Sequence, residues 1–257
     1  MTTKKRKEVP AGERLGERET ETHGLRIFLQ NARENEGDFI EKHGRFFEFL
    51  ERIDELFMSL VAEGPFPAGP VPAMLLLNSH ACYLGAVRIA LSGQVPPTHM
   101  TLRGALESTL FALIASKSRD NREIWLNREH DRNRCKNLFT ARNGIELVKE
   151  DPALYDLLIE AYELAIDFGG HPNLRSILDH ATFEDEPNRP SVNLAYLHHF
   201  SSTQSLRAIS ACIEVGLTIV CLSAHVTPDY DVSLAAHAKA CQLRDDFAQF
   251  LRAGGYL

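Results

Sequence analysis

The sequence has few cysteines, and none stands in the clustered spacing that builds disulfide frameworks or zinc fingers. Five cysteines occur among 257 residues, at positions 82, 135, 212, 221 and 241, with no Cys-x-x-Cys pair. Most of them lie among aliphatic residues, where a thiol behaves as a small buried hydrophobe. We therefore expect a reduced, cytoplasmic protein with neither a disulfide nor a metal site.

Standard catalytic motifs are missing as well. The chain has no glycine-rich phosphate loop, no Gly-x-Ser-x-Gly, no His-x-x-x-His and no Glu-x-x-His. These patterns supply, respectively, a phosphate cradle, a serine nucleophile and convergent metal ligands on a helix. Enzymes of those standard classes are unsupported, and no cofactor is expected.

Long uncharged hydrophobic runs are also lacking. Residues 71–91 contain Arg88, and residues 206–226 contain Arg207 and Glu214. A membrane-spanning helix needs roughly 20 mostly apolar residues with few or no charges. The basic first residues are followed by no apolar stretch, which argues against a secretory signal. We expect no membrane association.

What the sequence does contain is helical periodicity. The composition is ordinary for a globular protein, with 44% hydrophobic and 25% charged residues and a formal net charge of −7. From Asp38, an expected N-cap, apolar residues recur every three or four positions as far as Gly64. We predict an all-α protein, a single bundle of six to seven helices over residues 23–257 with little or no β-sheet, after a disordered charged tail at 1–22.

Further helix boundaries follow from proline, glycine and capping residues. The remaining predicted helices cover about 71–91, 98–118, 120–139, 144–150, 152–168, 201–225 and 233–253, with a short extended piece at 192–196. The segment 71–91 is apolar nearly all round, which predicts a central helix. A Ser201-x-x-Gln204 capping box is expected to open the helix at 201.

The most informative polar feature is the pair Arg103 and Glu107, four residues apart on a helix face rich in leucine. A charged side chain on an apolar helix face must be paired with an opposite charge or must lie in a solvent-filled cleft. Three interpretations stay open: a structural ion pair, an anion-binding arginine oriented by its glutamate, and a helix face that is simply exposed. Asn78 and His80 form a second polar spot within the apolar 71–91 segment, and we expect all four residues to form one ligand-binding network. A satisfied core histidine is the alternative for His80.

The segment Arg119–Arg142 carries seven basic residues against four acids, in a protein that is acidic overall. Such a face could bind phosphate groups of RNA or of a small anionic ligand. The acids are interleaved with the bases, so a solvated, salt-bridged face is the alternative.

Three segments carry a resemblance to a known family. They are Arg103-Gly-Ala-Leu-Glu107, Trp125-Leu-Asn-Arg-Glu-His-Asp131 and Gly169-Gly-His-Pro-Asn173. Over roughly residues 70–225 the chain resembles a group of uncharacterised bacterial all-α proteins, itself similar to the HEPN superfamily (higher eukaryotes and prokaryotes nucleotide-binding). The resemblance implies a helical bundle, a homo-oligomer (a dimer), and in many members a metal-independent ribonuclease of a toxin or defence system.

The HEPN signature, an arginine followed after four to six residues by a histidine, is matched by Arg175 and His180. The resemblance implies that these two would be the catalytic residues. Random placement of 20 arginines and 11 histidines gives such matches by chance, and a short ordinary helix is the alternative. Three functions therefore stay open: binding of a small or nucleic anion, RNA cleavage, and a helical protein–protein interaction module without a ligand.

Overall fold

The computed structural model describes residues 24–62, 69–170, 181–186, 189–194, 196–227 and 231–256. The protein is all-α, but within these ranges it has ten α-helices rather than the predicted six to seven. They are α1 (Gly24–Lys42), α2 (Gly44–Ala62), α3 (Pro70–Leu91), α4 (Val95–Ser116), α5 (Arg119–Leu126), α6 (Arg132–Leu138), α7 (Ala141–Glu146), α8 (Pro152–Ala165), α10 (Thr203–Val226) and α11 (Asp231–Ala253).

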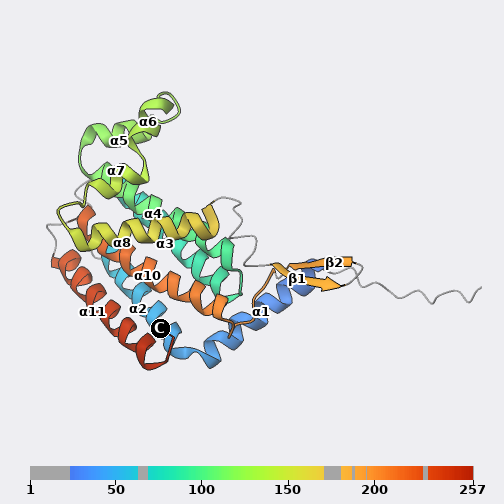
Figure 1. Cartoon of the computed structure of the whole chain (residues 1–257). Coiled ribbons are helices and arrows are strands. Elements are labelled where there is room, and N and C mark those ends of the chain that lie inside the picture. The colour runs from blue at the N-terminus through green and yellow to red at the C-terminus, as the bar shows by residue number, and fades with distance from the viewer. Residues whose placement is uncertain are drawn as a thin grey trace, which may run out of the picture.

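Helix α10 is the centre of the bundle. It contacts α2, α3, α4, α8 and α11, and Figure 1 shows it enclosed between these neighbours. Nearly every residue from Ala208 to Ala224 is buried. A helix that is apolar all round can only be stable when it is surrounded in this way. The core therefore runs along α10, and the short helices α5, α6 and α7 form a cap beyond one end of α4 (Figure 1).

The predicted helix beginning at Asp38 is wrong at its start. The chain is already helical from Gly24, and α1 ends at Lys42 before α2 begins at Gly44. The chain bends at His43, whose backbone N–H donates to the carbonyl of Phe39 at 2.8 Å. Phe39 before the bend and Phe46 after it are both buried in the same core. The apolar periodicity therefore continues across the bend and conceals it.

The predicted helix over 120–139 is two helices. Asp131 is the N-cap of α6, and its side chain accepts a hydrogen bond from the backbone N–H of Arg134 at 3.1 Å. Such a cap begins a new helix instead of continuing the old one. Ser118 caps α5 and Thr140 caps α7 in the same way. The division of 120–139 into α5 and α6 adds one helix and the division between α1 and α2 adds another, whereas α7 corresponds to the helix predicted at about 144–150.

Asp151 and Pro152 open α8 as predicted, with the Asp151 carboxylate accepting from the N–H of Leu154 at 3.1 Å. Helix α8 passes into a π-helical turn, η1 (Ile166–Gly170). The extended piece predicted at 192–196 is one strand of a hairpin. Strands β1 (Ala181–Glu186) and β2 (Arg189–Leu194) pair antiparallel, with Ala181 opposite Leu194.

Helix α3 is less central than its composition predicts. Ser79 and Tyr83 are fully buried against α4 and α10, but Met74, Leu77 and Leu84 are exposed to 65%, 50% and 45%. The exposed residues follow one another at helical spacing, so one face of α3 is an apolar stripe open to the surroundings. The central place belongs to α10 instead.

Candidate functional site

Arg103 and Glu107 form the ion pair that their spacing predicts. The Nε of Arg103 donates to Oε1 of Glu107 at 2.8 Å, and this hydrogen bond raises the pKa of the guanidinium. Tyr162 of α8 completes the cluster, because its hydroxyl accepts from Arg103 at 3.2 Å and donates to Glu107 at 3.1 Å. The two charged side chains are 26% and 30% exposed. The arrangement joins α4 to α8 and satisfies each charge.

Asn78 and His80 lie elsewhere. The Nε2 of His80 is 2.6 Å from Oδ1 of Asp54 on α2, and its ring stacks on Phe57 with centroids 5.0 Å apart. Asn78 donates instead to the hydroxyl of Ser108 on α4 at 2.6 Å. No hydrogen bond or ion pair between described residues joins either of them to Arg103 or Glu107. The structure therefore divides the expected network into three separate contacts.

Arg175 and His180 lie outside the described residues. The structure gives no arrangement for them.

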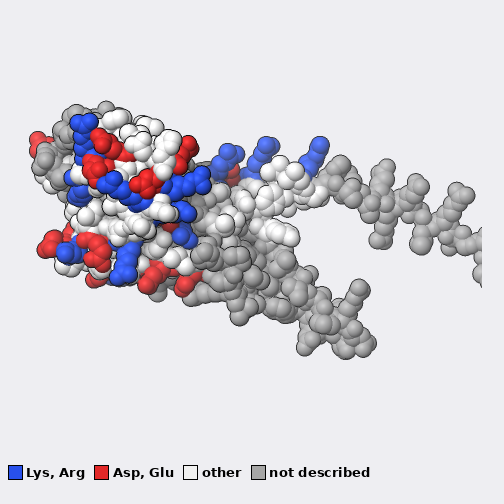
Figure 2. Space-filling view, turned by 90° about the horizontal axis from the view of Figure 1, so that it is seen from above, with Lys and Arg blue, Asp and Glu red and all other residues white. Residues whose placement is uncertain are grey.

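The Arg119–Arg142 segment forms α5, α6 and the start of α7. Arg119 pairs with Glu123 at 2.8 Å, and Arg134 pairs with Asp120 at 2.9 Å. Figure 2, which views the molecule from the side of these helices, shows basic and acidic side chains interspersed over this face. Oppositely charged neighbours reduce the field that a phosphate would experience. The contacts favour the salt-bridged alternative.

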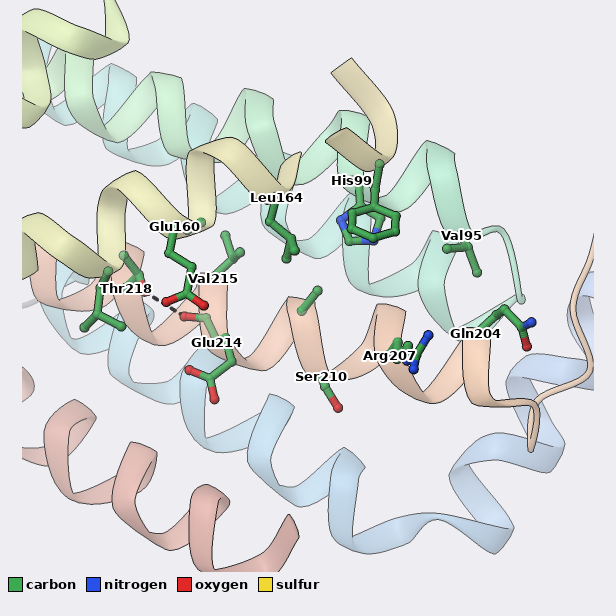
Figure 3. A pocket seen from close by; sticks show the side chains of 14 residues that line it. Val95, His99, Glu160, Leu164, Gln204, Arg207, Ser210, Glu214, Val215 and Thr218 are labelled. Carbon is green, nitrogen blue, oxygen red and sulfur yellow. Dashed lines mark hydrogen bonds between the residues drawn. The ribbon is translucent and has the colours of Figure 1, made fainter. Parts of the chain in front are cut away.

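A cavity lies between α8 and α10, with the start of α4 at one end (Figure 3). Its volume is about 680 Å³, within the range of small-molecule sites, roughly 300–1,000 Å³. Its apolar walls are built mainly by Leu157, Ala161, Leu164, Ala211 and Val215. These side chains present apolar surface to any molecule that enters the cavity.

Two carboxylates stand at one end of this cavity. Glu160 of α8 and Glu214 of α10 both line it. Burial raises the pKa of Glu214, Arg244 of α11 lowers it, and the nearby charge of Glu160 raises it again. The Nε of Arg244 lies 3.6 Å from Oε2 of Glu214. The positive charge of Arg244 therefore lies near two acidic side chains, Glu160 and Glu214.

The other end of the cavity carries donors instead. Arg207 and Gln204 line it from the first turns of α10, and Figure 3 shows them on the opposite side of Leu164 and Val215 from Glu160 and Glu214. Arg207 and Glu214 are seven residues apart, which corresponds to about 10 Å along a helix axis. In the sequence, these two residues indicate only that the segment is too charged for a membrane span. Their seven-residue spacing on one helix face is the signal that could have found the cavity.

A second group of chemically active side chains gathers where α10, α11 and the start of α8 meet. The ligand atoms of Cys221, His237 and Cys241 all lie within 4.8 Å of one another, and so do those of Asp151, His225 and His237. The cysteines are not clustered in the sequence, but the fold brings Cys221 and Cys241 together with these histidines. The missed signal is the pair Cys221-x-x-x-His225 and His237-x-x-x-Cys241, which has the same helical spacing as the His-x-x-x-His pattern that is absent.

Two of the described helices, α3 and α10, are long and apolar enough to cross a membrane by length and composition alone. The central helix of a bundle meets the same criterion, and 83% of the apolar window of α10 is buried inside the protein.

Comparison with known proteins found no matching family model, no similar curated protein and no similar solved structure. Only the chemistry of the described residues therefore bears on function.

Proposed function

We propose that this protein binds a small, elongated amphipathic molecule in the cavity between α4, α8 and α10. The observation that carries the proposal is the cavity itself: about 680 Å³ of mostly apolar lining, with two carboxylates at one end. Small-molecule sites combine apolar walls with a few polar groups that fix orientation. The cavity has both parts.

The carboxylate end favours a cationic group, such as a primary amine. Glu160 and Glu214 repel each other, and this repulsion contributes to the raised pKa of Glu214. A bound ammonium would relieve the repulsion and would favour the ionised form of both acids. Glu160 forms no hydrogen bond or ion pair with any other described residue, so its carboxylate is available to a ligand.

The opposite end favours an acceptor, such as a carboxylate. Arg207 and Gln204 offer N–H donors there, and a guanidinium can bind a carboxylate through two parallel hydrogen bonds. The apolar walls between the two ends suit a hydrocarbon chain or ring. The best fit is a molecule with an amine and an acid separated by about 10 Å, the distance along α10 between Arg207 and Glu214.

The test is a thermal-shift and calorimetric screen with linear ω-amino acids of increasing length. Alkylamines and alkyl carboxylates of the same lengths serve as probes of each end. Binding adds about 2.7 kcal/mol of stability when the ligand is at about 100 times its Kd. We expect an optimum chain length, with weaker binding of the two singly charged series.

Matched variants locate the site. Glu160→Gln should weaken the binding of alkylamines and ω-amino acids but not of alkyl carboxylates. Arg207→Gln should weaken the binding of alkyl carboxylates and ω-amino acids but not of alkylamines. Glu163→Gln is the control, because Glu163 is an exposed acid on the same helix that does not line this cavity. Equal binding by the wild type and by Glu160→Gln, or no stabilisation by any member of the three series, would refute the proposal.

Anion binding at Arg103 stays a prediction and is less favoured. The guanidinium already donates to Glu107 and Tyr162, so an entering anion would have to displace a carboxylate. Ribonuclease activity through Arg175 and His180 and a purely interacting role also stay predictions.

A further inference from the structure

The contact between α10 and α11 concentrates thiol and imidazole groups on facing helix surfaces. Cys221 and His225 are four residues apart on α10, and His237 and Cys241 are four residues apart on α11. Residues at this spacing share one face of a helix, about one turn apart. The two pairs therefore point toward the same space between the helices.

The donor atoms of three of these residues lie close enough together to converge on one ion. In a tetrahedral zinc site, bonds of about 2.0–2.3 Å place the ligand atoms roughly 3.3–3.8 Å apart. The sulfurs of Cys221 and Cys241 and a ring nitrogen of His237 already lie within 4.8 Å of one another. Sγ of Cys241 is 3.9 Å from Nδ1 of His237. Shifts of about 1 Å would bring these three atoms around one ion.

We propose that Cys221, His237 and Cys241 bind a structural Zn²⁺ ion, with His225 supplying the fourth ligand. Two thiolates and two imidazoles suit zinc and exclude the hard cations Mg²⁺ and Ca²⁺, which take oxygen ligands. His225 lies within 4.8 Å of His237 but belongs to the second group of donors, so its side chain must turn toward the sulfurs. Its place one turn after Cys221 on the same helix face allows that movement.

Two neighbouring residues support this site. Asp151 lies 3.6 Å from Nε2 of His225, and its carboxylate is also within 4.8 Å of a ring nitrogen of His237. Zinc-bound histidines usually donate their second N–H to such a carboxylate, which fixes the ring. Arg244 lies one turn after Cys241 on α11. Its buried Nε has no hydrogen-bond partner. Burial raises the pKa of the nearby Cys221 thiol to about 12, and the charge of Arg244 acts against that rise.

The site is reachable from solvent. Cys221 is 1% exposed, whereas Cys241 is exposed and His225, His237 and Asp151 are partly exposed. An ion can therefore enter from the α11 side and be held against the core. Once bound, it would join α10 to α11, with the Asp151 cap of α8 packed behind it.

The experiment uses the full chain, free of any affinity tag, kept reduced and stripped of metal by a chelator. Titration with Co²⁺, which replaces Zn²⁺ and is coloured, should give the visible absorption of a tetrahedral ion and a thiolate-to-metal charge-transfer band. Both should saturate at one Co²⁺ per chain. Added Zn²⁺ should abolish both signals and raise the thermal midpoint of unfolding.

Three variants assign the ligands. Cys241→Ser should weaken the thiolate-to-metal charge-transfer band, because one of the two sulfur ligands is removed. His237→Ala should lose the visible spectrum of a tetrahedral ion, because one of the four ligands is missing. Asp151→Asn, which keeps the helix cap, should weaken metal binding about 10–100-fold. Cys82→Ser is the matched control and should bind as the wild type does, because Cys82 belongs to neither group of donors.

Two results would overturn the proposal. One is the absence of a charge-transfer band in the reduced, folded wild type, with folding checked by circular dichroism. The other is equal Co²⁺ binding by the wild type, Cys241→Ser and His237→Ala. A Cys221–Cys241 disulfide in the oxidised chain, together with no metal binding in the reduced chain, would also overturn the proposal and would indicate a redox-active cysteine pair instead of a metal site. None of these outcomes bears on the cavity, whose ligand is tested separately.

Discussion

At the scale of single residues, the structure shows which pairs are adjacent along a helix and which meet only across helices. Arg103 and Glu107 pair because they are one turn apart, as their spacing predicts. Tyr162, which bonds to both, comes from another helix 55 residues further along the chain than Glu107. No local pattern indicates that contact. The same holds for Asp54, which meets His80 from α2.

Gly216 is a residue whose role only packing reveals. It lies mid-way along α10, where a Cβ atom would meet the ring of Tyr83 at 2.7–2.8 Å, closer than such atoms approach. Tyr83 is fully buried, so its ring has little room to move. We expect Gly216→Ala to lower the free energy of unfolding by about 1–2 kcal/mol, since overpacking costs about 1–3 kcal/mol and alanine recovers part through its helix propensity.

Gly37 provides the control, because it lies in α1 and a Cβ there would have no atom within 4 Å beyond those of its own helix turn. Gly37→Ala should raise the free energy of unfolding by about 0.5–1 kcal/mol. Urea unfolding followed by circular dichroism measures both variants. A Gly216→Ala protein as stable as the wild type would show that α10 and α3 can separate at this point.

At the scale of elements, helix termini were harder to predict than helices. The periodicity places α2, α3, α4, α8, α10 and α11 near their observed positions, because each buries a stripe. It misses α1 as a separate helix, and it joins α5 to α6. The expected start of α10 at a Ser201 box is shifted by one residue, since Ser202 is the N-cap and accepts from the N–H of Ser205 at 3.2 Å.

Because Ser202 is the N-cap and Ser201 is not, we expect substitutions of the two serines to differ in their effect on stability. Ser202→Ala removes an acceptor for an N–H at the start of the central helix and should lower the free energy of unfolding by about 1 kcal/mol. Ser201→Ala removes only an exposed hydrogen bond to His43, and the loss should be a few tenths of a kcal/mol. Chemical denaturation of both variants compares them. Equal losses, or a larger loss for Ser201→Ala, would favour the capping box that the sequence predicts.

At the scale of the whole molecule, the open question is what covers the apolar stripe of α3. Met74, Leu77 and Leu84 are exposed on a helix that is apolar enough to pass a membrane criterion, and only 44% of its apolar window is buried. A twofold axis places the same surface of two copies together, and an uncharged apolar stripe is complementary to itself. The homodimer that the resemblance implies stays a prediction, and this stripe is the surface at which we expect it to form.

We therefore expect light scattering to give a mass of about twice 28.8 kDa for the intact chain. The double substitution Leu77→Glu and Leu84→Glu should give a monomer, because four charges would face one another in the dimer. Leu126→Glu is the control, since Leu126 is also an exposed leucine, at 67%, but lies on α5. A wild-type monomer, or a dimer that survives the double substitution, would contradict this interface.

The amino-acid sequence by itself determined the all-α class, most of the long helices and the one-turn pairs, because these depend on contacts between residues a few positions apart. The tertiary structure alone decided which helix is central, where the cavity lies and that Cys221, His237 and Cys241 converge. Each of those features needs two or three helices to meet at a particular rotation and depth. Helical periodicity indicates which face of a helix is apolar, but it does not indicate which other helix will pack against that face.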